Sequence, residues 1–210
     1  SMQDHQLDPS VHINMVGLQD LRASASSQYS KIALSLLMKK LQSQTEHITL
    51  CDLRDDDHLF VDGKNVSDFQ TRRELLRKRT QVEIIEAVER LKSEILSQED
   101  IKLHAIDTAY PSNEFSKRFS IKFRPQEVLT PAELVESMKG SYLRIGTKRF
   151  SENIDEDIDH LLTHIESMPE DSWIHFSDIK GKGRTTFFMA LYDLLHNADK
   201  VSWEDIIQRQ

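Results

Sequence analysis

A glycine-rich segment near the C-terminal end combines residue types that bind phosphate. The sequence from Trp173 to Thr186 is WIHFSDIKGKGRTT, and apolar residues on both sides of the glycines predict a strand before them and a helix after them. A loop between a strand and a helix directs backbone N–H groups and the positive end of the helix dipole at an anion. Arg184 could hold two phosphate oxygens with its planar guanidinium, while Gly181 and Gly183 would let the backbone approach the ligand.

This segment has two other interpretations. A Gly-x-Gly sequence often marks nothing more than a turn between a strand and a helix. A nucleotide-binding P-loop requires Lys and then Ser or Thr after its last glycine, whereas Arg184 follows Gly183 here. The residues therefore exclude the nucleotide loop, and they are consistent with either an anion site or a plain turn.

The composition restricts the class of protein. With 210 residues, 38% hydrophobic and 30% charged, the chain is long enough for one globular domain with a buried core. No apolar run approaches the roughly 20 residues of a membrane span, and the net charge of −8 argues against nucleic acid as the main partner. A single cysteine, Cys51, excludes an internal disulfide, and the nine histidines show no metal-ligand spacing. We therefore expect neither a metal nor another cofactor.

The elements that must position the loop alternate between strands and helices. Buried strands are predicted over 47–53, 142–145 and 173–176, further strands within 101–125, and helices over 27–41, 70–97, 154–168 and 185–195. Thr130 and Pro131 indicate the start of another helix, and Val201 or Ser202 the start of a last short one. This alternation predicts an α/β fold.

Three local predictions are specific enough to be tested. Ser26 or Ser27 is expected to cap the first helix. Residues 55–69 are expected to form a polar loop, with a turn at Asp62 and Gly63. The helix over 70–97 is expected to bury one apolar stripe, made of Val82, Ile85, Val88, Leu91 and Ile95.

Segments along nearly the whole chain resemble the protein-tyrosine-phosphatase-like inositol phosphatases, the bacterial cysteine phytases. The family loop begins Trp-x-His-Phe-His-Cys and ends Gly-x-Gly-Arg-Thr-Thr, and the matching residues are Trp173, His175, Phe176, Gly181, Gly183, Arg184, Thr185 and Thr186. Residues 17–30 are similar to the family's N-terminal motif, and 52–69 to its Asp-Leu-Arg-x-Glu-x-His segment, which lies near the substrate. The resemblance implies a cysteine-phosphatase-like α/β fold, with a central mixed sheet flanked by helices and a phosphate-binding loop between a strand and a helix.

The residues and the resemblance together imply a domain organisation. Residues 1–14 are expected to be a tag remnant and a poorly ordered lead-in, and 15–210 a single phosphatase-like domain. Residues 101–125 are a candidate remnant of the family's small β subdomain. Family sequences usually continue past the Arg-Gln at the end, so this sequence is consistent with one domain of a longer protein, in which an active tandem copy could be present.

The chain departs from the family at the positions that carry catalysis. In the family a Cys thiolate attacks phosphorus, and an Asp protonates the leaving oxygen. Counting back from Arg184 places Asp178 at the Cys and Ser177 at the neighbouring His, and an ungapped alignment places Arg149 at the general acid. Because a guanidinium does not act as an acid near neutral pH, both roles are lost. The resemblance therefore implies a catalytically inactive member, a pseudophosphatase.

An active enzyme is the alternative hypothesis. Such an enzyme would hydrolyse inositol polyphosphate or phosphotyrosine through a non-standard nucleophile. Asp178 could form an aspartyl phosphate, but that chemistry uses a metal and a second acid, and no paired acidic motif surrounds this residue. Cys51 follows the pattern of a buried structural thiol. We hypothesise instead that Asp178 pairs with Arg184 or accepts loop N–H bonds, acting as a built-in anion that would repel an incoming phosphate.

Basic residues are expected to surround one pocket if the fold follows the family. They come from the loop, the former acid loop and the Asp-Leu-Arg segment: Lys180, Lys182, Arg184, Lys148, Arg149 and Arg54. Together with Gly181, Gly183 and Thr185 they could bind an inositol phosphate or another phosphoanion without turnover. Alternatively, Lys180 and Lys182 are solvated surface charges.

A protein partner is the other expected ligand of an inactive domain. The start of the sequence shows no apolar leader, and a single cysteine suits a reducing compartment. We therefore expect a cytoplasmic location, or the cytosol of a host cell if the protein is a bacterial effector, as some members of the family are.

Overall fold

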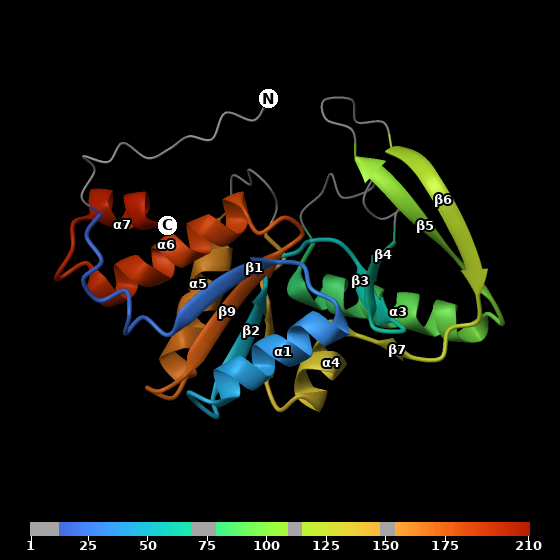
Figure 1. The fold of residues 1–210 in the computed structure, drawn as a ribbon, viewed down its shortest axis with the longest axis horizontal. Coiled ribbons are helices and arrows are strands. Elements are labelled where there is room, and N and C mark those ends of the chain that lie inside the picture. The colour runs from blue at the N-terminus through green and yellow to red at the C-terminus, as the bar shows by residue number, and fades with distance from the viewer. Residues whose placement is uncertain (1–12, 69–78, 109–114, 148–153) are drawn as a thin grey trace.

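The computed structural model describes residues 13–68, 79–108, 115–147 and 154–210, which form an α/β fold (Figure 1). In chain order the elements are β1 (Ala23–Ser27), α1 (Lys31–Gln42), β2 (Ile48–Asp52), β3 (His58–Val61), β4 (Lys64–Ser67), α3 (Gln81–Ser97), β5 (Ile101–Thr108), β6 (Phe115–Phe123), β7 (Val128–Leu129), α4 (Pro131–Ser137), β8 (Ser141–Arg144), α5 (Asp155–Ser167), β9 (Trp173–Asp178), α6 (Gly183–Asn197) and α7 (Trp203–Arg209). None of these described helices is long and apolar enough to cross a membrane.

The central sheet has four strands in the order β1-β9-β2-β8, and all of its described pairings are parallel. Strand β9 lies between β1 and β2, so the strand that leads into the glycine loop has a ladder partner on each side. Because parallel strands end at the same edge, the segments that follow β2, β8 and β9 meet there. The expected α/β fold with a central sheet flanked by helices is confirmed, but the antiparallel pairings expected of a mixed sheet lie, among the described residues, in two smaller sheets.

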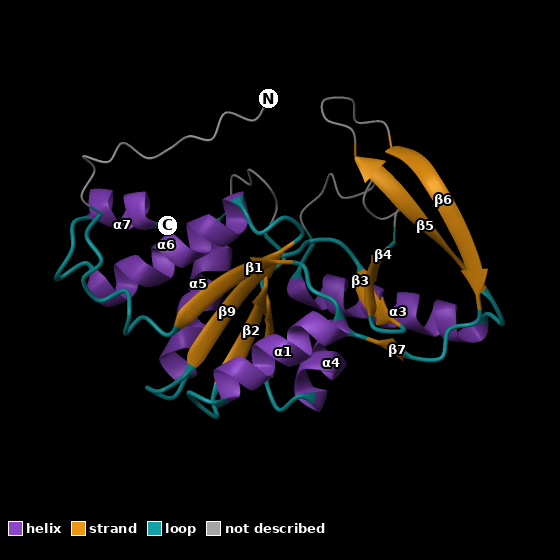
Figure 2. Cartoon of the chain, viewed as in Figure 1, coloured by secondary structure: helices purple, strands orange, loops and turns teal. Residues whose placement is uncertain are grey.

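Two hydrophobic clusters cover the two faces of the central sheet. On one face, Phe176 and Cys51 pack with residues of α5 and α6, including Phe188. On the other face, Leu50 packs with residues of α1 and α4. Neighbouring residues of β2 therefore enter different clusters, as the two-residue period of a strand requires, and helices lie on both sides of the strands (Figure 2). Cys51 is fully buried, as expected, and burial raises the pKa of its thiol.

The segment that follows β2 is a hairpin, not the polar loop expected over 55–69. Strand β3 pairs antiparallel with both β4 and β7 and is buried along its whole length. The predicted turn at Asp62 and Gly63 is confirmed, and both residues have positive φ (46° and 74°), which is the signature of a type I′ hairpin turn. The sequence pattern failed because acidic residues on both sides mask a short apolar strand.

Two helix predictions need correction. Residues 23–27 form β1, and α1 starts later, with Ser30 as the N-cap that accepts the N–H of Ala33 at 3.2 Å. Serine suits either structure, so the ladder with distant β9 decides the outcome. In α3 the buried residues are Ile84, Ala87 and Val88, whereas Val82 and Ile85 are 62% and 54% exposed. The beginning of the predicted 70–97 helix, residues 70–78, lies outside the described residues.

The starts of α4 and α7 are as predicted. Thr130 caps α4 in a reciprocal capping box with Glu133, with Pro131 in the first turn, and Ser202 caps α7. Strands β5 and β6 form a separate two-stranded ribbon with an irregularity between Ala105 and Ile106, beside α3 and away from the central sheet (Figure 1). The turn expected at Pro111 lies outside the described residues, and the assignment of 101–125 to a subdomain stays a prediction, as does the 1–14 and 15–210 division.

Candidate functional site

The glycine segment is a loop between a parallel strand and a helix, as the sequence predicted. Strand β9 ends at Asp178 and α6 begins at Gly183, with Lys182 at the N-cap position. In this described part of the chain no side chain caps the start of α6. The N-terminal N–H groups of the helix therefore point into the loop without a side-chain acceptor.

The two loop glycines have different roles. Gly181 has a φ of +62°, and a Cβ placed there would lie 2.4 Å from the backbone N of Ser27 and 2.7 Å from the carbonyl carbon of Ser26. The loop therefore presses against the end of β1, and only glycine fits. Gly183 has nothing within 4 Å of the same position, so space does not require a glycine there.

The carboxylate of Asp178 lies inside the loop. Its Oδ1 accepts the backbone N–H of Lys180 at 2.7 Å and also that of Gly181. Its Oδ2 lies 3.6 Å from Nε of Arg184, and the side chain is only 6% exposed. The hypothesis that Asp178 accepts loop N–H bonds and pairs with Arg184 is confirmed as a description of the geometry.

Arg184 is held by the segments that leave the other strands of the sheet. Its Nη1 donates to the carbonyl oxygens of Leu53 at 2.9 Å and Thr147 at 2.8 Å, and to Oδ1 of Asp55 at 3.1 Å. Its side chain is 15% exposed. The guanidinium therefore joins the ends of β2, β8 and β9 and has a carboxylate on each side.

Arg54 does not lie open to a ligand, contrary to the expectation that it would line a binding pocket. Its guanidinium makes a bidentate pair with Asp56 at 2.9 and 2.6 Å and donates to the side chains of Gln28, Asn65 and Ser67. These contacts use the five N–H groups of an arginine, and the residue is 2% exposed. Arg54 thus supports the site by fixing the β3–β4 hairpin to the end of β2.

A buried charge network behind the loop was missed from the sequence. Asp52 contacts Nε2 of His58 at 3.0 Å and the hydroxyl of Tyr142 at 2.8 Å, with Nη1 of Arg144 at 3.8 Å. Burial alone would raise the pKa of Asp52, but His58 and Arg144 outweigh it and hold that pKa well below its usual range. Burial and the charge of Arg54 lower the pKa of His58. The resemblance to the Asp-Leu-Arg segment was the one signal that could have drawn attention to this network.

His175 lies on the loop strand and is neutral. Its Nδ1 is 2.8 Å from Oγ of Ser24 and its Nε2 is 3.0 Å from Oγ of Ser26. Burial lowers its pKa to about 4. The ring therefore ties β9 to β1 through two neutral hydrogen bonds, in the strand directly before the loop.

The remaining residues predicted for the site fall into three groups. Lys180 and Lys182 are exposed on the loop. Ser177 and Thr185 are buried, and the hydroxyl of Thr185 has no hydrogen-bond partner among the described residues; the same is true of buried Thr147. Lys148 and Arg149 lie outside the described residues.

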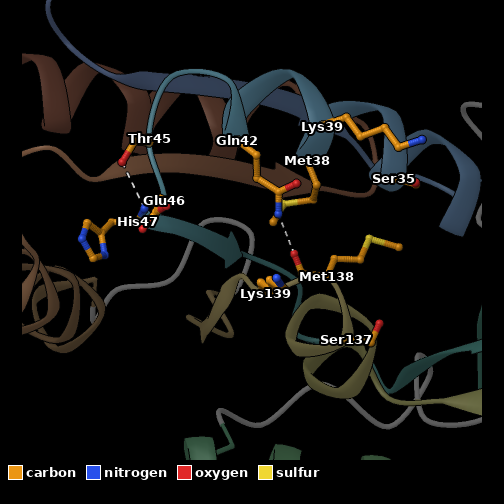
Figure 3. A pocket seen from close by; sticks show the side chains of 10 residues that line it. All are labelled: Ser35, Met38, Lys39, Gln42, Thr45, Glu46, His47, Ser137, Met138 and Lys139. Carbon is orange, nitrogen blue, oxygen red and sulfur yellow. Dashed lines mark hydrogen bonds between the residues drawn. The ribbon is translucent and has the colours of Figure 1, made fainter.

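A pocket of about 670 Å³ lies at the opposite edge of the sheet from the loop. It is formed by α1, the segment before β2 and the end of α4, and Gln42 crosses it to donate to the carbonyl oxygen of Met138 at 2.8 Å (Figure 3). None of the residues predicted for the site lines it. Within the described part of the chain, no group of three or more His, Cys, Asp or Glu side chains is arranged to hold a metal ion.

The chain is similar in sequence to known proteins. A family model named PTP-like phytase, with the description "Inositol hexakisphosphate", matches residues 51–196, which is more than half of the chain. Among curated proteins, 43 residues are 44% identical to the uncharacterized protein AvrBs1.1 of Xanthomonas campestris pv. campestris and of Xanthomonas euvesicatoria. Each match covers 20% of this chain and 41% of the relative.

Solved structures extend the similarity to almost the whole chain. The PTP-like myo-inositol phosphatase of Mitsuokella multacida, in complex with myo-inositol-(1,3,4,5)-tetrakisphosphate, is 28% identical with a TM-score of 0.84. The tandemly repeated PTP-like phytase of the same organism gives the same values, and in both cases the match covers 95% of this chain and 33% of the other. A PTP-like phytase of Bdellovibrio bacteriovorus is 26% identical with a TM-score of 0.70, over 90% of this chain and 66% of that one.

Proposed function

The chain belongs to the PTP-like phytase family, and we propose that within it this domain is catalytically inactive and acts as a protein-interaction module. One observation carries the proposal. At the position of the family's nucleophile stands Asp178, and its carboxylate is hydrogen-bonded to the N–H groups of the loop itself. A group held in this way faces the loop backbone instead of an incoming phosphorus atom.

The electrostatics of the loop support the loss of catalysis. Phosphoryl transfer depends on donors that stabilise the charge of the transferring group. Here two carboxylates already contact the guanidinium of Arg184: Oδ2 of Asp178 lies 3.6 Å from its Nε, and Oδ1 of Asp55 lies 3.1 Å from its Nη1. An incoming phosphate would have to displace or neutralise them, and like charges brought together cost several kcal/mol. Arg149 at the aligned acid position is the second argument, and it rests on the sequence alone.

Phosphoanion binding without turnover is the second candidate function. Lys180 and Lys182 are exposed at the rim of the loop, where they could attract a polyanion. The Mitsuokella multacida relative was solved with an inositol tetrakisphosphate, which supports an inositol phosphate as the ligand class. Arg54 is buried and donates its N–H groups to other side chains, and Arg184 lies near two carboxylates. These contacts support a protein-interaction module over a phosphoanion-binding domain.

The test is an activity assay combined with a binding assay on one sample. Release of inorganic phosphate from inositol hexakisphosphate and from para-nitrophenyl phosphate would be measured for the wild type and for Arg184→Ala. We expect both proteins to give the same background rate. Calorimetry with inositol hexakisphosphate would be run in parallel, and we expect weak binding that Arg184→Ala does not change.

Other outcomes would assign other functions. Turnover that Arg184→Ala abolishes would contradict the proposal and support the alternative, an active phosphatase with a non-standard nucleophile. Micromolar binding without turnover, lost in Arg184→Ala, would make the domain a phospholigand sensor. A role as an effector in a host cell stays a prediction, because the Xanthomonas matches cover only 43 residues.

A further inference from the structure

We infer that the loop carries its own anion: the Asp178 carboxylate occupies the place of a bound oxyanion, and removing it restores affinity for a free tetrahedral oxyanion such as phosphate. The inference rests on the proposed loss of catalysis at the same loop, and it adds a reason why the loop is closed to phosphate. It concerns binding, so it can fail or hold independently of turnover.

The contacts of Asp178 are those that an oxyanion would make. One oxygen accepts two consecutive loop N–H groups, from Lys180 and Gly181, and the other lies 3.6 Å from the guanidinium of Arg184. Backbone N–H groups and an arginine are the donors with which such a loop holds a phosphate. The carboxylate is buried, so its charge is poorly screened by solvent.

Contacts other than those of Asp178 also hold the loop. Gly181 lies against the backbone of Ser26 and Ser27 in β1, where even a Cβ has no room. Arg184 is fixed from the opposite side by the carbonyl oxygens of Leu53 and Thr147. We therefore expect the loop to keep its fold, and Arg184 its position, when the carboxylate is absent.

Unused donors remain around the loop. Helix α6 starts at Gly183 without a side-chain cap, among the residues that the structure describes. The hydroxyl of Thr185, in the first turn of that helix, is 1% exposed and has no partner in the described part of the chain. Buried polar groups in folded proteins almost always have a partner, so an unpaired hydroxyl beside the loop indicates that a further acceptor belongs there.

A purely local role for Asp178 makes a different prediction. Aspartate often accepts N–H groups two and three residues ahead, simply to shape a turn. If that were its only function, Asp178→Ala would loosen the loop and create no binding. Asp178→Asn separates the two roles, since it keeps an oxygen for the N–H groups of Lys180 and Gly181 and removes the negative charge.

The experiment measures binding of inorganic phosphate by calorimetry and by the amide chemical shifts of Lys180 and Gly181. We expect no saturable binding by the wild type at millimolar phosphate. For Asp178→Ala we expect phosphate binding that is at least about 100-fold tighter. The substitution removes a repulsion between like charges that costs several kcal/mol. Asp178→Asn should lie between the two, and Asp178→Ala combined with Arg184→Ala should bind no better than the wild type.

Two results would overturn the inference. One is a folded Asp178→Ala protein with no gain in phosphate affinity; the other is a wild type that binds phosphate as tightly as the variant. If Asp178→Ala does not fold, as judged by its thermal transition, Asp178→Ser and Asp178→Asn carry the test. Phosphate release from para-nitrophenyl phosphate by a wild type that binds no free phosphate would contradict the proposed function alone, so the two failures are distinguishable.

Discussion

At the residue scale, Gly181 sets how closely the loop approaches β1. Its φ of +62° and the backbone of Ser27 at 2.4 Å from a Cβ both exclude a side chain. Gly183 has an ordinary φ and open space around it, two residues further along. Substituting each glycine with alanine therefore compares a crowded position with an open one.

We predict that Gly181→Ala lowers the free energy of unfolding by at least about 1–2 kcal/mol, the cost of a left-handed residue with a Cβ, before any clash is added. Gly183→Ala should change it by less than about 1 kcal/mol, because alanine is favoured over glycine in a helix. Urea denaturation of both variants measures the difference. Equal effects would show that the contact between the loop and β1 does not constrain the fold.

The chemistry of the loop was predictable because it lies in one continuous segment. Asp178 and Arg184 are six positions apart, and their relation follows from counting. The hydrogen bonds of Arg54 were not predictable, because its partners are distant in the sequence: Gln28, 26 positions away, follows β1, and Asn65 and Ser67, 11 and 13 positions away, lie on β4. A basic residue in a motif indicates a pocket only when its donors are free, and only the folded structure shows whether they are.

At the scale of elements, Arg54 joins the β3–β4 hairpin to the end of β2. Its guanidinium contacts Asp56 at 2.6 Å and reaches two side chains of β4. Both members of the ion pair are almost completely buried, with 3% and 2% of their side chains exposed. A buried carboxylate that loses its partner destabilises a protein far more than an exposed one does.

We predict that Arg54→Lys lowers the free energy of unfolding by about 3 kcal/mol, since an ammonium cannot reproduce the bidentate pair or reach all five acceptors. Arg90→Lys is the matched control, because Arg90 lies on α3 with 67% of its side chain exposed and pairs with Glu86 at 4.0 Å. That change should cost less than about 0.5 kcal/mol. Chemical denaturation at neutral pH measures both. Similar losses would mean that Arg54 contributes only as a surface charge does.

Helices with local start signals were predictable, as were strands β2, β8 and β9 with their apolar runs, whereas β1 and β3 were not. Thr130, Pro131 and Glu133 form a capping box that is complete within four residues. Strand β1 shows no such signal: its serines are compatible with a cap or a strand, and its ladder with β9 decides. Strand β3 was missed because acidic residues on both sides mask its short apolar run.

At the scale of the whole molecule, the buried histidines make stability depend on pH. Burial lowers the pKa of His175 to about 4 in the folded state, whereas an unfolded histidine has its ordinary value of about 6.5. Between these values the unfolded chain binds a proton that the folded chain does not, so stability falls as the pH falls. The lowered pKa of His58 acts in the same direction.

We predict that the free energy of unfolding falls between pH 7 and pH 5 and that His175 accounts for about 2 kcal/mol of the loss. His175→Asn keeps polar partners for Ser24 and Ser26 and should remove that part of the pH dependence. His47→Asn, at a half-exposed position, should leave the dependence unchanged. Urea denaturation at the two pH values gives the comparison, and an equal loss in all three proteins would refute the role of His175.

The order of strands in the central sheet has a consequence for how the chain folds. Strand β1 has β9 as its ladder partner, and the Ser24–His175 contact between them spans 151 positions. At a synthesis rate of about 5–20 residues per second, β1 leaves the ribosome on the order of ten seconds before β9. During that time β1 is unpaired and one edge of β2 is open to wrong partners. A nascent chain that stops before residue 173 contains α1, α4 and α5, but it lacks α6, α7 and the strand that joins β1 to β2.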